Sequence, residues 1–140
     1  MKVPPKIYSE LMSHAESDAP NECCGMIGGT DGTAQKVYRA RNAEASPLRY
    51  MIEGQDVYRI HNEIEDAGQE LLAIYHSHTA SPAYPSQTDI NLAFLGGAVG
   101  GGLAWPGVLY LIVSLVDEKA VRAFDISEDA QVTEVEVTVE

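Results

Sequence analysis

Apolar residues recur along the chain at two spacings, which together predict helices alternating with strands. Ile7, Leu11 and Ala15 follow one another at helical spacing with polar residues between them, which predicts an amphipathic helix. We expect this helix to end at residues 18–20, where a proline restricts the preceding backbone. A second amphipathic helix is predicted over residues 54–68, which finish on a glycine suited to a helix end.

Shorter apolar runs, several of them rich in valine and isoleucine, predict strands. They lie at residues 23–28, 34–40, 71–75, 108–116, 120–126 and 131–139, with a short candidate at 49–52. Residues 28–32 are rich in glycine and predict the turn of a hairpin. The last run alternates valine with acidic residues, so we expect a half-exposed strand there. Residues 96–107 contain many glycines and predict a mobile loop, either a substrate lid or a tolerated surface insertion.

The order of these segments predicts the fold class. A helix is followed by two strands, a short strand, a helix, a strand, a third helix near residue 90 and three more strands. This order predicts an α/β domain with a mixed, strongly curved sheet flanked by helices. The 140 residues, 45% of them hydrophobic, are enough to bury one core, so we expect a single domain over residues 1–140.

Charge and cysteine content narrow the class of protein further. The net charge is −12, with 21 acidic residues against 9 basic ones, and this disfavours nucleic acid as a partner because phosphate binding relies on clustered Lys and Arg. Cys23 and Cys24 are adjacent, so they cannot staple a loop, and we expect both to pack on opposite faces of a strand. A sequence without a disulfide framework suits a reducing compartment.

Neither the first residues nor the longest apolar run predicts a membrane segment. The first six residues carry charge and proline where a secretory signal has an apolar core. The longest apolar run, 108–116, is about half the length that spans a bilayer. We therefore expect a cytoplasmic protein that does not contact a membrane.

Candidate chemistry is concentrated between residues 74 and 90. His76 and His78 follow an apolar strand at a spacing of two, so both imidazoles can face the same point near the strand end. A proline-containing loop follows, and Ser86-Gln-Thr-Asp89 then opens a helix. Two histidines and one carboxylate make three protein ligands, and catalytic zinc sites use three protein ligands and leave a fourth position to water.

Each of these features also has a purely structural interpretation. A buried histidine pair often has its nitrogens satisfied by backbone groups, and Ser86 with Asp89 also forms the pattern of a helix capping box. The two interpretations of Asp89 are compatible, because a helix start stabilises the deprotonated carboxylate that a metal requires. His14 falls on the polar side of the first helix and is expected at the surface. His61 is expected to be packed or exposed, since the ligand set is complete without it.

Taken together, these residues resemble the motif of the JAMM (MPN+) zinc metallopeptidases. That motif is His-x-His, seven residues and Ser-x-x-Asp, and the chain reproduces it from His76 to Asp89 without a gap. The family also has a glutamate at the start of an upstream apolar strand, and Glu22 matches that position. Residues 42–47, 74–80 and 83–86 look like the bacterial branch of the family that acts on sulfur-carrier proteins.

The resemblance implies a fold, a site and an activity. The fold would be the JAMM/MPN fold, of the cytidine-deaminase-like type, with Zn²⁺ held by His76, His78 and Asp89. Glu22 would move the proton from the attacking water to the leaving amine, and Ser86 would donate a hydrogen bond to the developing oxyanion. The partner would be a ubiquitin-like sulfur carrier ending in Gly-Gly, released from cysteine by amide hydrolysis in cysteine biosynthesis.

Two alternatives remain open at this point. One is an isopeptidase that removes ubiquitin-like modifiers from lysine, and the other is a non-catalytic scaffold. Scaffold members of the family have typically lost metal ligands, whereas this chain retains His76, His78, Asp89, Ser86 and Glu22. The sequence does not predict the oligomeric state.

Overall fold

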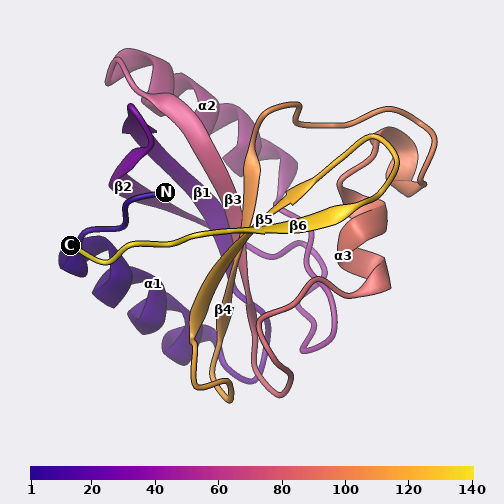
Figure 1. Cartoon of the computed structure of the whole chain (residues 1–140), viewed down its shortest axis with the longest axis horizontal. Helices are drawn as coiled ribbons and strands as arrows, with labels where there is room; N and C mark the ends of the chain where they lie inside the picture. The colour runs from indigo at the N-terminus through magenta and orange to yellow at the C-terminus, as the bar shows by residue number, and fades with distance from the viewer.

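Helices and strands alternate along the chain largely as the apolar spacing predicts. The structure, a computed structural model, describes residues 1–140 (Figure 1). Its elements are α1 (Pro5–Asp18), β1 (Cys24–Thr30), β2 (Thr33–Ala40), α2 (Gly54–Asp66), β3 (Glu70–His78), α3 (Gln87–Leu92), the 3-10 turn η1 (Leu95–Gly97), β4 (Leu109–Ser114), β5 (Val121–Ile126) and β6 (Val132–Val135).

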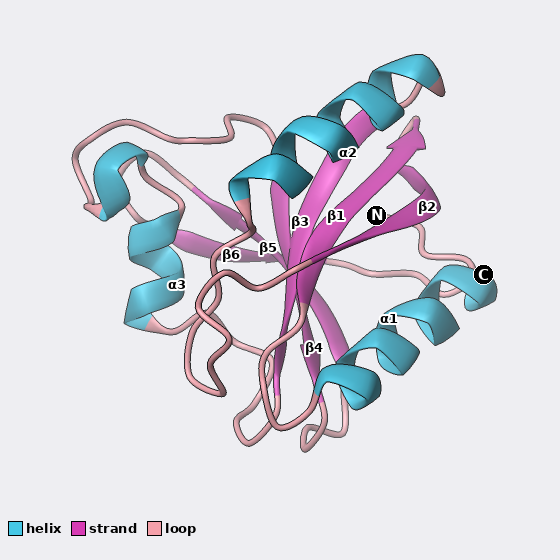
Figure 2. Cartoon of the chain, turned by 180° about the vertical axis from the view of Figure 1, so that it is seen from behind, coloured by secondary structure: helices cyan, strands magenta, loops and turns pink.

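The strands form one mixed, six-stranded sheet in the order β2-β1-β3-β4-β5-β6. The pair β3–β4 is parallel and the other neighbours are antiparallel. The sheet is strongly twisted, so that in Figure 2 the strands cross near the middle of the view and diverge on both sides. Since parallel neighbours need a long crossover, the chain leaves the end of β3, passes through α3 and η1, and returns to start β4. This crossover follows His78 directly and carries Ser86 and Asp89 of the predicted site.

The two faces of the sheet bury separate cores, because successive strand residues point to opposite faces. α1 covers one face, where Leu11 shares a cluster with Tyr75. α2 and α3 cover the other face, where Ile60 shares a cluster with Ile74 (Figure 1). His76 and His78 have the same parity as Ile74, so they lie on the face covered by α2 and α3.

The prediction for the two cysteines is confirmed. Cys23 lies in the core under α1 and Cys24 in the core under α2, and both are buried, free thiols. Burial raises the pKa of Cys23 to about 11 and that of Cys24 to about 12, which keeps both as inert thiols at neutral pH.

The predicted hairpin is present, but its turn is shorter than expected. The turn consists of Asp31 and Gly32, both with positive φ, whereas Gly28 and Gly29 belong to β1. A side chain at Gly29 would collide with the backbone carbonyl of Thr33, which explains a glycine in mid-strand. The last strand is also shorter than predicted, and the segment after it pairs with the N-terminus through a bridge between Lys2 and Thr138.

The prediction of a surface position for His14 is wrong. His14 is only 4% exposed, and its Nδ1 lies 2.7 Å from the hydroxyl of the buried Tyr75. Its Nε2 lies 3.3 Å from a carboxylate oxygen of Asp18. This histidine therefore links α1 to the centre of the sheet, and burial lowers its pKa. His61 is exposed on α2, which agrees with a surface residue.

The prediction of a strand at residues 49–52 is also wrong. This segment makes only an isolated bridge, between Asn42 and Ile52. The backbone of Arg49 and Met51 is instead hydrogen-bonded by the side chain of Asn42, so no neighbouring strand is needed. Residues 41–53 therefore form an irregular segment between β2 and α2.

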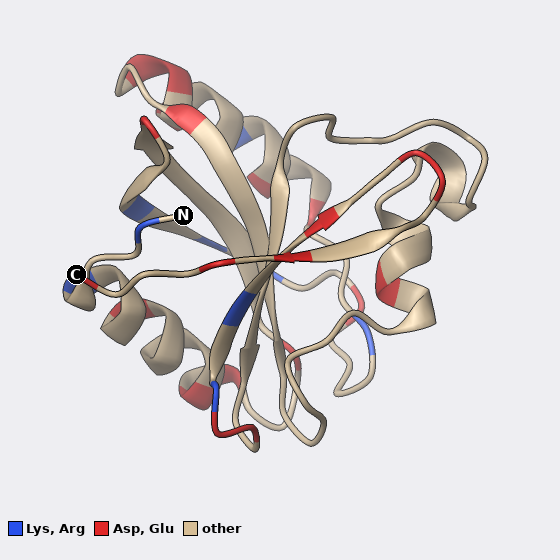
Figure 3. Cartoon of the chain, in the orientation of Figure 1, with Lys and Arg blue, Asp and Glu red and all other residues tan.

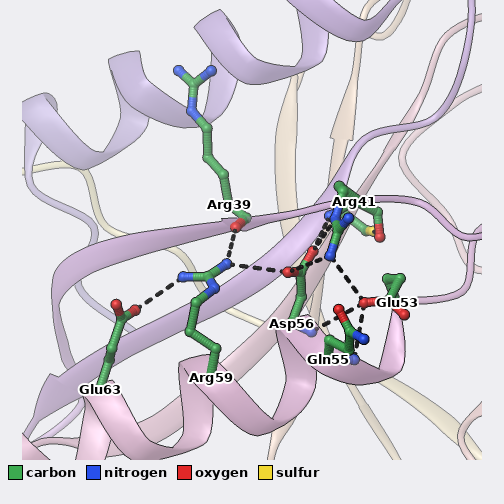
Figure 4. A network of polar contacts seen from close by, with 8 residues as sticks. Arg39, Arg41, Glu53, Gln55, Asp56, Arg59 and Glu63 are labelled. Atoms are coloured by element: carbon green, nitrogen blue, oxygen red, sulfur yellow. Dashed lines mark hydrogen bonds and ion pairs between the residues drawn. The ribbon is translucent and has the colours of Figure 1, made fainter.

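An ion-pair network fixes both ends of this segment (Figure 4). Asp56, in the first turn of α2, accepts hydrogen bonds from the backbone N–H of Arg41 at 2.8 Å and from its guanidinium at 3.2 Å. The same guanidinium donates to Glu53 at 3.1 Å, and Glu53 also caps α2. Arg59 extends the network to the carbonyl of Arg39 in β2.

Acidic residues occur on several elements of the chain rather than on one. Figure 3 shows them on α1, on α2 and at the β5–β6 turn, while the fewer Lys and Arg residues are scattered. No helix of the chain combines the length and apolar character that crossing a bilayer requires.

Candidate metal centre

Three side chains predicted as ligands converge on one point. The Nε2 atoms of His76 and His78 lie 3.1 Å apart. The Oδ2 atom of Asp89 lies 3.1 Å from the first and 3.0 Å from the second. All three residues are buried, and their ligand atoms are grouped closely enough to hold one metal ion. The histidines belong to β3 itself rather than to the residues beyond it.

The hydrogen bonding of His78 leaves the correct nitrogen free for a metal. Its Nδ1 lies 2.8 Å from the carbonyl oxygen of Pro82, which only accepts, so Nδ1 carries the proton. The lone pair is then on Nε2, which faces His76 and Asp89. Fixing the tautomer through the opposite nitrogen is the usual arrangement around protein-bound metals.

Asp89 is held as a carboxylate by its surroundings. Burial acts to raise its pKa, but the hydrogen bond with His76 and the close approach of His78 outweigh burial and hold the pKa well below the usual range. The backbone N–H of Ser86 also donates to Oδ2, at 2.9 Å. Burial acts to lower the pKa of His78, but Asp89 and the carbonyl of Pro82 outweigh it and raise that pKa. The predicted capping box is therefore confirmed, and it orients Asp89 toward the two histidines.

The ligand spacing fits a small tetrahedral ion. Zinc binds nitrogen and oxygen ligands at about 2.0–2.2 Å, so ligand atoms on a tetrahedral zinc lie about 3.4 Å from one another. The three atoms here are 3.0–3.1 Å apart, close to one face of such a tetrahedron. Two imidazole nitrogens and a carboxylate are also the donor types that zinc accepts. The residues present therefore fit a zinc ion.

Glu22, which the family resemblance assigns to the site, lies two residues before β1. In the antiparallel β1–β3 pair, Cys24 lies opposite His76, and the backbone N–H of Ser77 donates to the carbonyl of Cys23. Glu22 precedes this paired segment by two residues, at the end of β1 that lies beside the end of β3 carrying His76 and His78. Glu22 is 4% exposed, and its Oε1 has no hydrogen-bond partner.

The pKa of Glu22 suits a group that exchanges protons near neutral pH. Burial raises it to about 7, with His78 acting to lower it and Asp89 to raise it. A buried carboxylate with such a pKa can both accept and return a proton at neutral pH.

Ser86 occupies the N-cap of α3. Its Oγ accepts a hydrogen bond from the backbone N–H of Asp89 at 3.1 Å, and its side chain is exposed. The hydroxyl hydrogen makes no contact with another group of the chain and remains available for a ligand. Ser86 therefore has a structural role already, and its geometry permits a second one.

Two residues that the sequence reasoning missed hold the loop between His78 and Ser86. The buried hydroxyl of Ser114, at the end of β4, donates to the carbonyl of Ser81 at 2.8 Å. A carboxylate oxygen of Asp117 accepts from the backbone N–H of Ala83 at 3.1 Å. Both residues come from the β4–β5 hairpin, Ser114 as the last residue of β4 and Asp117 from the turn that follows. They reach the loop because β4 lies parallel to β3 and next to it, which no local sequence pattern predicts.

A cavity of about 400 Å³ lies next to the ligand group and is lined mostly by apolar residues. Its lining includes Ile74 of β3, Tyr110 of β4 and Trp105 of the glycine-rich segment. Tyr50 also lines the cavity and stacks on the ring of His76, with ring centroids 4.2 Å apart. The sequence analysis did not single out Tyr50.

Fold and site together define a JAMM/MPN-type domain. Residues 4–127 match the family model described as "Prokaryotic homologs of the JAB domain". The chain belongs to this family of prokaryotic JAB-domain, JAMM/MPN-type proteins.

Curated relatives fall in the same group. The chain is 37% identical over 89 residues to a CysO-cysteine peptidase of Mycobacterium tuberculosis, a match that covers 62% of this chain and 61% of that protein. The aligned part is thus less than two thirds of the length of that relative. A desampylase of Pyrococcus furiosus is 29% identical over 136 residues, which cover 97% of this chain and 89% of that protein.

Solved structures agree on the fold. Protein DSY2949 from Desulfitobacterium hafniense superposes with a TM-score of 0.83 at 31% identity, covering 100% of this chain and 93% of that one. A JAB1/MPN domain protein from Archaeoglobus fulgidus superposes with a TM-score of 0.59 at 17% identity, covering 99% of both chains. The predicted fold class, a JAMM/MPN fold with a mixed sheet flanked by helices, is therefore confirmed.

Proposed function

We propose that this protein is a zinc-dependent hydrolase that cleaves the amide between the C-terminal glycine of a ubiquitin-like sulfur-carrier protein and cysteine. The observation that carries the proposal is the convergence of His76, His78 and Asp89 next to the buried carboxylate of Glu22. Three ligands leave a position for solvent or substrate, whereas structural zinc sites are closed by four protein ligands.

His76, His78 and Asp89 are the residues that would hold the ion. Zinc, when bound, acts as a Lewis acid that polarises the scissile carbonyl and lowers the pKa of water.

In this proposal Glu22 is the general base and then the general acid. Its carboxylate takes a proton from the attacking water, and the resulting carboxylic acid gives that proton to the departing amine. Burial supports this role, because it raises the pKa of Glu22 to about 7 and so places both protonation states within reach at neutral pH.

Ser86 is the proposed donor to the oxyanion that develops on the scissile carbonyl. Its Oγ is already fixed by the hydrogen bond that it accepts from the backbone N–H of Asp89, so its hydrogen can be aimed at a substrate without further ordering. A preorganised donor of this kind typically lowers a barrier by about 3–4 kcal/mol. Neither Cys23 nor Cys24 takes part, because both are buried in the cores.

The proposed partner is a carrier with a Gly-Gly tail. The name of the mycobacterial relative, CysO-cysteine peptidase, supports cysteine as the leaving group. A tail of two glycines is thin enough to lie extended beside a sheet edge or in a narrow groove. In this proposal the reaction is a late step of cysteine biosynthesis.

A second candidate function is the removal of ubiquitin-like modifiers from lysine. The match to the desampylase favours it, because that alignment runs along 97% of this chain. The two candidates share the ligand group, Glu22 and Ser86, and differ only in the leaving amine. A non-catalytic scaffold is disfavoured by the intact ligand set.

Mass spectrometry of two defined substrates tests these proposals. The zinc-loaded protein is incubated with a Gly-Gly-ending carrier joined to cysteine, and separately with the same carrier joined to the ε-amine of lysine. We expect the first substrate to lose one cysteine residue and the second to be cleaved more slowly. The reverse order of rates would favour the isopeptidase, and no cleavage of either by a metal-loaded protein would contradict the hydrolase.

A further inference from the structure

The two histidine ligands are held in different ways. Nδ1 of His78 is hydrogen-bonded to the carbonyl of Pro82. Nδ1 of His76 is fully buried and has no hydrogen-bond partner. Metal-binding histidines usually donate this N–H to a carbonyl or carboxylate, which fixes the orientation of the ring. Another contact must therefore orient His76.

Tyr50 supplies that contact. Its ring lies almost parallel to the His76 imidazole, with an interplanar angle of 15° and centroids 4.2 Å apart. Tyr50 is 5% exposed and His76 is 1% exposed, so neither ring can rotate without disturbing the other. Stacking restrains the plane of the imidazole and therefore the direction of the Nε2 lone pair.

Asn42 in turn fixes the backbone on both sides of Tyr50. Its Nδ2 donates to the carbonyl of Arg49 at 3.0 Å, and its Oδ1 accepts from the N–H of Met51 at 3.0 Å. Nδ2 also donates to the carbonyl of Glu22, and Oδ1 accepts from the N–H of Glu44, both at 3.0 Å. Both donors and both acceptor sites of the carboxamide are thus used, all of them on backbone groups.

The same segment also holds the backbone of Glu22. The N–H of Glu22 donates to the carbonyl of Ser46 at 2.9 Å, while its carbonyl accepts from Asn42. Residues 42–51 therefore contact the site twice, once at the main chain of Glu22 and once at the ring of His76. The cavity wall formed by Tyr50 belongs to this segment as well.

We propose that Tyr50 is a positioning residue for the metal ligand His76, and that the Asn42 carboxamide holds Tyr50 in its stacked position. The inference rests on the proposed metal site and adds residues that neither touch the ion nor take part in proton transfer. It predicts that metal affinity depends on an aromatic ring at position 50 and not on its hydroxyl group.

The test is a Zn²⁺ affinity series measured by competition with a chromogenic chelator. We expect Tyr50→Leu to weaken Zn²⁺ binding by about 10–100-fold, the usual cost of losing the group that orients a ligand. Tyr50→Phe keeps the ring and should bind Zn²⁺ within about twofold of the unmodified protein. The matched control is Tyr58→Leu, because Tyr58 is 74% exposed on α2 and should not affect binding.

Co²⁺ gives a second readout that general destabilisation would not move. The visible absorption of Co²⁺ in the site reports its ligand geometry, so Tyr50→Phe should reproduce the original spectrum and Tyr50→Leu should change it. Thermal melting of the metal-free variants, followed by circular dichroism, shows whether each is folded before metal is added. If Tyr50→Leu does not fold, the Zn²⁺ affinity of Asn42→Ala decides the question.

Asn42→Ala tests the second half of the inference. It should weaken Zn²⁺ binding in the same direction as Tyr50→Leu. The double variant should lose no more than the larger single loss, because Asn42 affects metal binding through the stacking of Tyr50 on His76. Unchanged Zn²⁺ affinity in Tyr50→Leu, or in Asn42→Ala if the first variant does not fold, would overturn the inference while leaving the proposed function intact. Additive losses would overturn the role of Asn42. An unmodified protein that binds no Zn²⁺ would contradict both proposals.

Discussion

The Nε2 atoms of His76 and His78 lie 3.1 Å apart in the buried end of the sheet. Two neutral imidazoles cannot both donate through these atoms, because the proton of His78 is on Nδ1, where Pro82 accepts it. The lone pair on Nε2 of His78 and the carboxylate of Asp89 therefore face one point beside Nε2 of His76, an arrangement that a cation stabilises.

Removing one ligand should remove the metal. We expect His78→Ala to lose bound zinc, because two remaining ligands do not make a stable zinc site. Elemental analysis of the purified protein measures the stoichiometry. The matched control is His61→Ala, which changes the same residue type on the exposed surface of α2 and should retain the metal. A full zinc complement in His78→Ala would mean that the ligand set is wrong.

Replacing the proposed base should separate chemistry from metal binding. Glu22→Gln preserves the size of the side chain but cannot accept a proton, so hydrolysis should fall by about 10²–10⁴-fold. Zinc content should not change, because Glu22 is not one of the three converging ligands. Glu44→Gln, in the exposed part of the 42–51 segment, is the control and should remain active. Normal turnover of Glu22→Gln would remove Glu22 from the mechanism.

Ser86 offers a test in which a helix cap and a catalytic donor can be distinguished. Ser86→Ala loses both functions, so we expect hydrolysis to fall by about 10²–10³-fold and stability to fall by about 1 kcal/mol. Ser86→Asp keeps an N-cap acceptor for the N–H of Asp89 but has no hydrogen to donate. It should therefore regain most of the stability, measured by urea unfolding, without regaining the rate. Recovery of the rate in Ser86→Asp would show that the serine acts only as a cap.

The network around Asp56 predicts a pH-dependent contribution to stability. Hydrogen bonds from Arg41 lower the pKa of this carboxyl in the folded state. A lowered folded-state pKa means that the stabilisation is present above the unfolded pKa of about 4 and is lost as the pH falls through the folded value. Asp56→Asn should therefore cost about 1–2 kcal/mol at pH 7, and less at pH 3.

Urea unfolding at pH 7 and pH 3 measures this difference. Asp66→Asn, at the exposed end of α2, is the matched control and should change stability little at either pH. An equal effect of Asp56→Asn at both pH values would show that the ion pairs with Arg41 and Arg59 do not stabilise the fold.

Local patterns predicted the elements whose partners are close in sequence. The helical spacing from Ile7 to Ala15 predicted α1, and the apolar runs on either side of Asp31-Gly32 predicted the first hairpin. The same reasoning was wrong for residues 49–52, where the side chain of Asn42 takes the place of a strand partner. It was also wrong for His14, because the polar side of a helical pattern does not reveal a buried tyrosine on β3.

The sequence by itself determined that His76 and His78 share one side of a strand, because side chains two residues apart on a strand point the same way. It also determined that Ser86 and Asp89 would cap one helix. Only the tertiary structure decided that Glu22 is buried beside the end of β3 and that Tyr50 stacks on His76. Those contacts join residues far apart in the chain, and they depend on strand register and on side-chain packing between elements. No local spacing encodes either of them.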